Sequence, residues 1–229
     1  MAAFSWATQL PGVTDSNMHV ALAAGAVGLM TILAVAANVA LGKGKEAVTP
    51  APKLSIKGLF EQLTEFIGSM TDTVVGPEGR PYVPMFATIF FFILINNIFG
   101  LVPSLGTASE NINTGLAVGL FVFVVYNAFG IKEHGLGYVK HFMGPIWWLA
   151  PLILVVELFS HLVRPLSLSI RLRANMLADH SVLGIFTDLV PYVVPVPFYM
   201  LGLFVSCMQA FIFTVLTMIY VSMALSHDH

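Results

Sequence analysis

Long stretches without a charged residue dominate this chain of 229 residues and decide what it can fold into. Only 10% of the residues are charged, against about 25% in an ordinary soluble domain. An uncharged apolar run of about 20 residues is long enough to cross the hydrocarbon core of a membrane. Inside lipid the backbone must satisfy its own hydrogen bonds, which a helix does. The sequence therefore predicts an all-α integral membrane protein and excludes a soluble globular fold.

The order of the apolar runs predicts five membrane crossings in a single membrane domain covering residues 1–229. The crossings are expected at 18–41, at 81–109 and 111–131 as a helical hairpin, and at 145–188 and 189–226 as a pair. The last run is longer than one upright crossing requires. We therefore expect it to be strongly tilted, bent near Pro195 and Pro197, or both.

Residues 54–74 show a different pattern, in which apolar residues recur at helical spacing among charged ones. The charged residues are Lys57, Glu61, Glu65 and Asp72. This pattern predicts an amphipathic helix lying on the membrane surface. Docking of the helix against a soluble domain of a partner is the alternative.

Basic residues predict the orientation of the chain in the membrane. Lysines follow the first and third expected spans, whereas the first 17 residues and the loop around Glu110 contain neither Lys nor Arg. Because basic residues favour the cytoplasmic side, we expect the N-terminus outside and the C-terminus in the cytoplasm. The missing basic segment at the start also indicates that the first apolar stretch is retained as a helix.

Other function classes find no support in the sequence. A net charge of −2 gives no indication of nucleic-acid binding. The single cysteine, Cys207, provides neither a disulfide framework nor a metal cluster. The chain shows no glycine-rich phosphate loop and no internal repeat.

Ionisable residues gather inside the apolar segment 145–188. They are Glu157, His161, Arg164, Arg171, Arg173, Asp179, His180 and Asp188. An arginine at mid-bilayer costs at least about 2.5–3.5 kcal/mol, so such residues usually mark a transport pathway or a water-filled cavity. At about 100° per residue, Arg171 shares one helix face with Glu157, Asn175 and Asp179, while Arg173 points nearly the opposite way. Pro165 predicts a break or kink within this helix.

Two motifs resemble one known family. Residues 164–176 read RPLSLSIRLRANM, which strongly resembles the signature of subunit a of the F-type ATP synthase membrane sector. Residues 209–217 read QAFIFTVLT and are followed by Tyr220 and Ser222, which resembles the last helix of the same family. With the order of the spans, the resemblance covers nearly the whole chain from about Lys53.

The resemblance implies a non-catalytic stator subunit without a cofactor, located in an energy-transducing membrane such as the bacterial inner membrane. Its implied partners are a rotating ring of c subunits, the peripheral-stalk b subunits and lipid, while ATP chemistry takes place on other subunits. It further implies two offset half-channels and a pair of C-terminal helices that run inclined along the ring. The coupled ion, proton or sodium, stays open at this stage.

The same resemblance implies roles for individual residues. Arg171 falls on the essential arginine of the family, which faces the ring carboxylate, and Asn175 and Gln209 fall on its polar neighbours. Glu157 and His180 match positions associated with the ion-access paths. An arginine is protonated at every accessible pH, so one residue can repel cations and attract an empty ring carboxylate.

Two positions depart from the family pattern. Family members often carry an ionisable residue seven positions before the glutamine, where this chain has Gly202. We expect Asp179 to compensate for it, and we expect a glutamate at position 202 either to be tolerated or to rescue His180→Ala. Arg173 stands where an aromatic residue is common, and we expect it to pair with another helix, a lipid headgroup or Asp188.

Two alternatives come from other function classes. An independent proton-coupled secondary transporter usually contains repeated halves around a site at the membrane midplane, and no repeat is detectable here. A membrane haem protein could use His161 and His180 as axial ligands. These histidines, however, lie about 100° apart on the same predicted helix.

Overall fold

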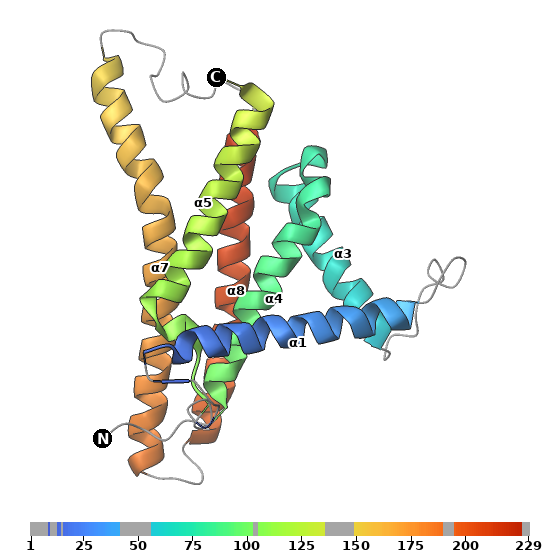
Figure 1. Ribbon diagram of the computed structural model, residues 1–229, viewed down its shortest axis with the longest axis vertical. Coiled ribbons are helices and arrows are strands. Elements are labelled where there is room, and N and C mark those ends of the chain that lie inside the picture. The colour runs from blue at the N-terminus through green and yellow to red at the C-terminus, as the bar shows by residue number, and fades with distance from the viewer. Residues whose placement is uncertain are drawn as a thin grey trace.

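The computed structural model describes residues 9, 13–14, 16–41, 56–102, 105–135, 149–189 and 195–225. Within these ranges every regular element is helical (Figure 1). The elements are α1 Met18–Leu41, α3 Ile56–Val74, η2 Pro77–Tyr82, α4 Val83–Leu101, η3 Ala108–Glu110, α5 Ile112–His134, α7 Ala150–Leu189 and α8 Pro195–Leu225. Five helices, namely α1, α4, α5, α7 and α8, are long and apolar enough to cross a membrane. The prediction of an all-α membrane protein is confirmed.

The last two helices are too long to cross a membrane upright. Helix α7 has 40 residues and α8 has 31, which corresponds to lengths of roughly 60 Å and about 46 Å. The hydrocarbon core is only about 30 Å thick. In Figure 1, α1 runs crosswise to the long axes of α7 and α8, so α1 and the α7/α8 pair cannot all stand upright in one bilayer. Helices of these lengths must incline or extend beyond the hydrocarbon core.

The prolines act differently from the sequence prediction. Helix α7 runs without interruption through Pro165, so the expected break does not occur there. The carbonyl of Pro165 accepts a hydrogen bond from the Ser169 hydroxyl at 2.7 Å, and neighbouring helices can hold a proline-containing helix together in a membrane. Pro195 is the first residue of α8, where a missing N–H is harmless. Of the alternatives expected for residues 189–226, a tilt or a bend near Pro195 and Pro197, the structure shows that α8 is a continuous helix from Pro195 to Leu225.

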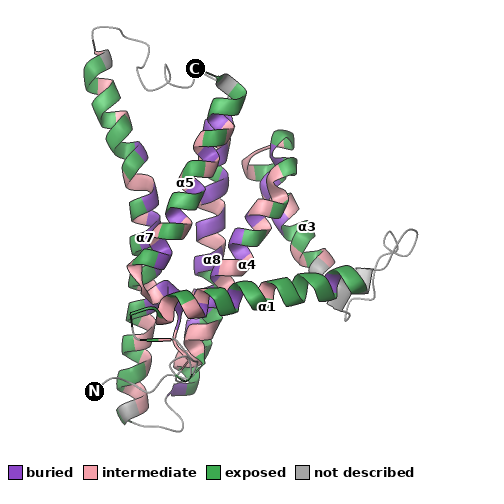
Figure 2. Ribbon diagram, viewed as in Figure 1, coloured by how far each residue is buried: buried purple, intermediate pink, exposed green. Residues whose placement is uncertain are grey.

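Buried side chains gather where α4, α5, α7 and α8 meet, and the outer faces of these helices stay exposed within the single chain (Figure 2). The central side chains include Phe86 and Ile93 of α4, Tyr126 of α5, Leu172 of α7 and Phe213 of α8. Contacts among these buried side chains thus hold together helices that are far apart in the sequence. It also fixes α7 against α8, which matters for the polar groups described below.

Two glycines bring α5 and α7 into close contact. A Cβ atom at Gly119 would lie 2.7 Å from the carbonyl oxygen of Pro165 and 2.8 Å from Oγ of Ser169. One turn earlier, a Cβ atom at Gly115 would lie 3.2 Å from the carbonyl oxygen of Ser169. Small residues at this spacing let membrane helices pack closely. The α5 glycines therefore position the segment of α7 that precedes Arg171.

The structure gives α3 one buried and one exposed side. Ile67 and Thr71 are buried, whereas Glu65 and Asp72 are exposed. Arg80 of η2 donates two hydrogen bonds to the carboxylate of Asp72, both at 2.9 Å. These hydrogen bonds lower the pKa of Asp72 below its usual value. The amphipathic character expected for residues 54–74 is thus present in α3, and residues 54–55 lie outside the described ranges.

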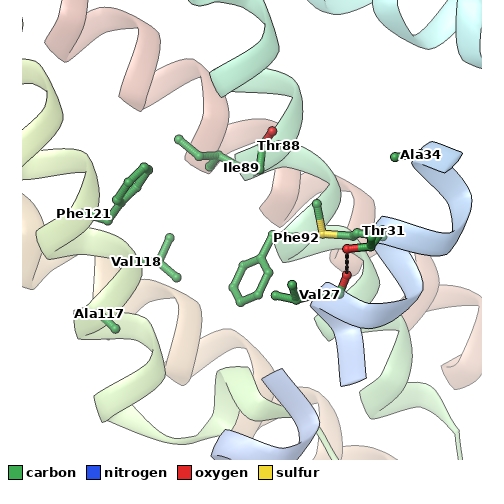
Figure 3. Close-up of a pocket in the computed structure, with 10 residues that line it drawn as sticks. Val27, Thr31, Ala34, Thr88, Ile89, Phe92, Ala117, Val118 and Phe121 are labelled. Carbon is green, nitrogen blue, oxygen red and sulfur yellow. Dashed lines mark hydrogen bonds between the residues drawn. The ribbon is translucent and has the colours of Figure 1, made fainter. Parts of the chain in front are cut away.

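An open apolar groove of about 470 Å³ lies between α1, α4 and α5 (Figure 3). Its lining includes Met30 and Thr31 of α1, Phe92 of α4 and Phe121 of α5. The hydroxyl of Thr31 donates to the carbonyl of Val27 at 2.8 Å, so it is satisfied within its own helix. The groove offers hydrophobic surface and no ionisable group, which separates it from the polar groups of α7 and α8.

Candidate functional site

A hydrogen bond joins the two sequence motifs. Nδ2 of Asn175 on α7 donates to Oε1 of Gln209 on α8 at 2.6 Å. Gln209 is only 2% exposed, and its Nε2 atom has no hydrogen-bond partner among the described residues. An unsatisfied amide in a membrane interior is costly unless water or another group reaches it. The site can therefore accept a further polar ligand at Gln209.

Arg171 lies one turn before Asn175 on α7, and its side chain is exposed. In the described part of the chain, Arg171 has no carboxylate within ion-pair distance. Leu168 and Leu172 face the core and are each 1% exposed. Arg171 therefore lies at the edge of the buried face of α7, where its guanidinium can reach a group outside this chain.

Arg173 lies at the other edge of the same buried face. Two residues along a helix correspond to a rotation of about 200°, so Arg171 and Arg173 point about 160° apart. Both side chains are exposed. The contact with His180 is the largest cause that lowers the pKa of Glu110 in η3, and the charge of Arg173 is a smaller one. The side chain of Asp188, the expected partner of Arg173, lies outside the described part of the structure.

His180 contacts two other elements. Its Nδ1 atom lies 3.5 Å from Oε2 of Glu110 in η3. On α4, a Cβ atom at Gly100 would lie 2.7 Å from Nε2 of His180, so the glycine makes room for the imidazole. The ring is thereby held between the end of α4 and η3.

The carboxylate of Asp179 occupies the space beside Gly202. A Cβ atom at position 202 would lie 2.7 Å from Oδ2 and 3.1 Å from Oδ1 of Asp179. It would also lie 2.7 Å from Cδ2 of Leu101 on α4. A side chain at position 202 therefore requires the Asp179 carboxylate and the Leu101 side chain to move, and the tolerance of a glutamate there stays a prediction. The missing side chain on α8 is instead matched by a carboxylate from α7.

A second polar cluster lies nearer the N-terminal end of α7. Arg164 contacts Glu157 at 3.9 Å, and the guanidinium carbon of Arg164 lies 5.4 Å from the ring centre of Tyr220. His161 is 5% exposed and its Nε2 forms a 2.8 Å hydrogen bond with Oδ1 of Asn127 on α5. His161 and Asn127 are 34 residues apart in the sequence, and no local motif predicts their contact.

Several buried polar atoms lack a hydrogen-bond partner among the described residues. They belong to His19 of α1, Asn96 and Asn97 of α4, Asp179 and His180 of α7, and Ser206 and Gln209 of α8. Asn97 lies one turn before Leu101, and Ser206 lies one turn after Gly202, so these residues flank the contact between Asp179 and Gly202. Unpaired polar groups at this density are suited to holding ordered water.

Sequence reasoning missed Glu110 as a site residue. Its only sequence signal is that it is the one charged residue between two uncharged apolar runs.

The structure separates the two histidines considered as haem ligands, because His161 contacts α5 and His180 contacts η3 and α4. Within the described ranges, no group of three His, Cys, Asp or Glu residues could hold a metal ion.

Comparison with known proteins agrees with both motifs. The family model described as ATP synthase A chain matches residues 22–222. ATP synthase subunit a of Bdellovibrio bacteriovorus is 49% identical over 99% of each chain. ATP synthase subunit a 1 of Syntrophotalea carbinolica is 45% identical over 76% of this chain and 74% of its own, and ATP synthase subunit a of Geobacter sulfurreducens is 43% identical over 76% of each. The chain therefore belongs to the ATP synthase A chain family, as an integral membrane subunit of that complex.

Proposed function

We propose that this subunit translocates ions by providing two offset half-channels that meet at Arg171. Ions entering by one half-channel load a carboxylate of the rotating c-ring and leave by the other after rotation. The observation that carries the proposal is the exposed Arg171, in a membrane-spanning helix, beside the 2.6 Å hydrogen bond between Asn175 and Gln209. An arginine on an outer helix face is costly in lipid, so we expect a neighbouring subunit to supply its acidic partner.

The charge of Arg171 can serve two purposes: it can block a direct leak between the half-channels, and it can attract the ring carboxylate. A guanidinium keeps its proton at every accessible pH, so it repels a cation that would leak directly between the half-channels. The same charge attracts a ring carboxylate that has just lost its ion. Asn175 and Gln209 can hydrogen-bond to water or to the guanidinium without adding charge.

The two polar clusters are the proposed access paths. His180 and Asp179, with the unpaired groups of Asn97 and Ser206, form the path from outside. Glu157, whose side chain is 44% exposed, lies toward the other end of α7 and belongs to the cytoplasmic path. Each path ends near Arg171, which separates them along the helix.

The proposed orientation places η3 outside and the C-terminal end of α5 in the cytoplasm. Cysteines replacing Asn113 and Lys132, which are exposed at opposite ends of α5, test it in a background without Cys207. A membrane-impermeant thiol reagent should label position 113 from outside and position 132 from the cytoplasmic side. The reverse pattern would contradict the orientation.

The proposed partners are the c-ring, along the outer faces of α7 and α8, and the peripheral-stalk b subunits. The test of function is ion conductance of liposomes that contain this subunit alone, the c-ring alone, or both. We expect conductance only when both are present, because each ion must pass through a ring carboxylate. Conductance by the subunit alone would instead indicate an independent transporter.

A further inference from the structure

His161 is a buried histidine that neither sequence motif contains. It lies on α7, one turn after Glu157 and one turn before Pro165. Two rings of α5 meet the imidazole edge-on, with the centre of Phe123 at 5.0 Å and that of Tyr126 at 5.2 Å from its own centre. The imidazole is therefore packed against α5 and lies away from the outer surface of α7.

The polar contacts of the ring determine which of its nitrogens carries the proton. Nδ2 of Asn127 donates to the carbonyl of Phe123 at 2.7 Å, so Oδ1 is the amide atom that faces α7. Nε2 of His161 lies 2.8 Å from this Oδ1, and because a carbonyl oxygen only accepts, Nε2 is the donor. The Tyr126 hydroxyl lies 3.4 Å from each ring nitrogen and can donate to Nδ1. A neutral imidazole thus satisfies both of its nitrogens on α5.

The same cluster extends to the charged groups of the proposed cytoplasmic path. The ring centre of Tyr126 lies 6.0 Å from that of Tyr220 on α8. The guanidinium carbon of Arg164 lies 5.4 Å from the Tyr220 ring centre, where a cation is attracted to the ring face. Arg164 also contacts Glu157 at 3.9 Å. Two tyrosines therefore connect the surroundings of His161 with the pair of Glu157 and Arg164.

Pro165 explains why α7 needs support at this point. In an α-helix the carbonyl of residue 161 accepts from the N–H of residue 165, and proline has no N–H. Helix α7 nevertheless continues through Pro165. Glu157 lies before this point and Arg171 lies after it. A side-chain link from α5 to His161 can therefore hold the part of α7 that carries Glu157 in line with the part that carries Arg171.

We propose that His161 is a positioning residue of the cytoplasmic path, whose neutral imidazole ties α7 to Asn127 of α5 and thereby sets the place of Glu157. This inference rests on the proposed role of Glu157 in that path. The imidazole acts through the helix and does not carry the ion, because its nitrogens face α5. The inference adds two residues, one on each helix, that lie outside both motifs.

The test measures passive proton conductance through the membrane sector. Inverted vesicles containing the assembled synthase are stripped of the soluble ATPase sector, and conductance is divided by the amount of assembled complex from an immunoblot. His161→Leu fills the space and removes the hydrogen bond to Asn127, so we expect conductance to fall about tenfold, as when a buried polar group loses its partner. In His161→Gln the amide N–H can still donate to Asn127, and we expect at least about half of the conductance to remain.

A double variant separates positioning from packing. His161→Leu with Asn127→Leu leaves neither partner of the hydrogen bond behind, so we expect the complex to assemble normally. Because the link between α5 and α7 is still missing, conductance per assembled complex should stay about tenfold low. Asn113→Leu makes the same change at an exposed position near the other end of α5 and should have no effect. Normal conductance in the double variant would show that the pair serves packing only and would overturn the inference.

Combination with Glu157→Gln tests whether His161 acts through Glu157. If it does, adding His161→Leu to Glu157→Gln should lower conductance by less than about twofold further, since the two effects are then not additive. A further loss of about tenfold would show an independent role and contradict the inference. Normal conductance with Glu157→Gln alone would remove Glu157 from the path, and the inference with it. A loss with Glu157→Gln but none with His161→Leu would overturn only the role of His161.

Discussion

Arg171→Ala is expected to abolish ion-coupled ATP synthesis in a complex that still assembles. The side chain is exposed and makes no ion pair within the described ranges, so its removal should leave the packing of α7 intact. A pair of unit charges about 4 Å apart near a protein surface interacts by about 4 kcal/mol, so we expect synthesis to fall by at least about 100-fold. The measurement is ATP synthesis driven by an imposed ion gradient, normalised to assembled complex by immunoblot.

A passive leak should accompany this loss, because the charge that separates the half-channels is gone. Arg171→Lys should also fail largely, since lysine lacks the planar guanidinium and can lose its proton when it is desolvated. Normal synthesis in the lysine variant would show that a positive charge alone is sufficient. Normal synthesis in the alanine variant would remove Arg171 from the mechanism.

The second change with a large expected effect concerns the carboxylate of Asp179 on α7 and the neighbouring position 202 on α8. Gly202→Asp alone places a Cβ atom 2.7 Å from Oδ2 of Asp179 and adds a like charge. Overpacking in a filled interior costs about 1–3 kcal/mol, so we expect a loss of ion pumping or of assembled complex of about fivefold or more. Asp179→Gly alone should also reduce pumping, because the outer path loses its carboxylate.

The double variant Asp179→Gly, Gly202→Asp should recover pumping to within about threefold of the unmodified complex, since one carboxylate again occupies the shared space. Asp179→Asn is the matched control, because it preserves the shape and removes the charge. Full activity of Asp179→Asn, together with failure of the double variant, would show that the position is needed for packing and not for transport.

Much of the fold follows from local features of the sequence. Helix α1 covers the same residues as the first apolar run, because no charge or proline interrupts it and polar residues flank it. The second apolar run is different: residues 81–109 contain α4 only up to Leu101, followed by the segment that ends in η3. Apolar composition therefore located the run but not the turn within it, where Gly106 adopts a φ of 79° that suits glycine.

The helix break expected at Pro165 was mispredicted for a related reason. Local propensity disfavours proline inside a helix, but packing decides whether the helix continues. At Pro165 the close approach of Gly119 on α5 supports α7 from outside. That support comes from a residue more than forty positions earlier, which local reasoning does not weigh.

Only part of the candidate site could likewise be predicted from local features of the sequence. Helical periodicity and the two motifs predicted that Arg171 and Asn175 share a face, and the contact between Asn175 and Gln209 agrees with the expected neighbourhood. The place of Asp179 against Gly202 could be suggested only because both positions can be counted from the two motifs. Glu110 could not be found in this way, because its contact with His180 depends on how η3 is held against α7.

The central claim is that Arg171, and not the neighbouring Arg173, faces the rotating ring. The most direct test compares ATP-driven ion pumping by Arg171→Ala and Arg173→Phe in inverted vesicles, with each rate divided by the amount of assembled complex. Both changes remove one positive charge from exposed positions two residues apart on α7. We predict that pumping is lost with Arg171→Ala and largely retained with Arg173→Phe. Retained pumping with Arg171→Ala, and its loss with Arg173→Phe in a fully assembled complex, would contradict the account.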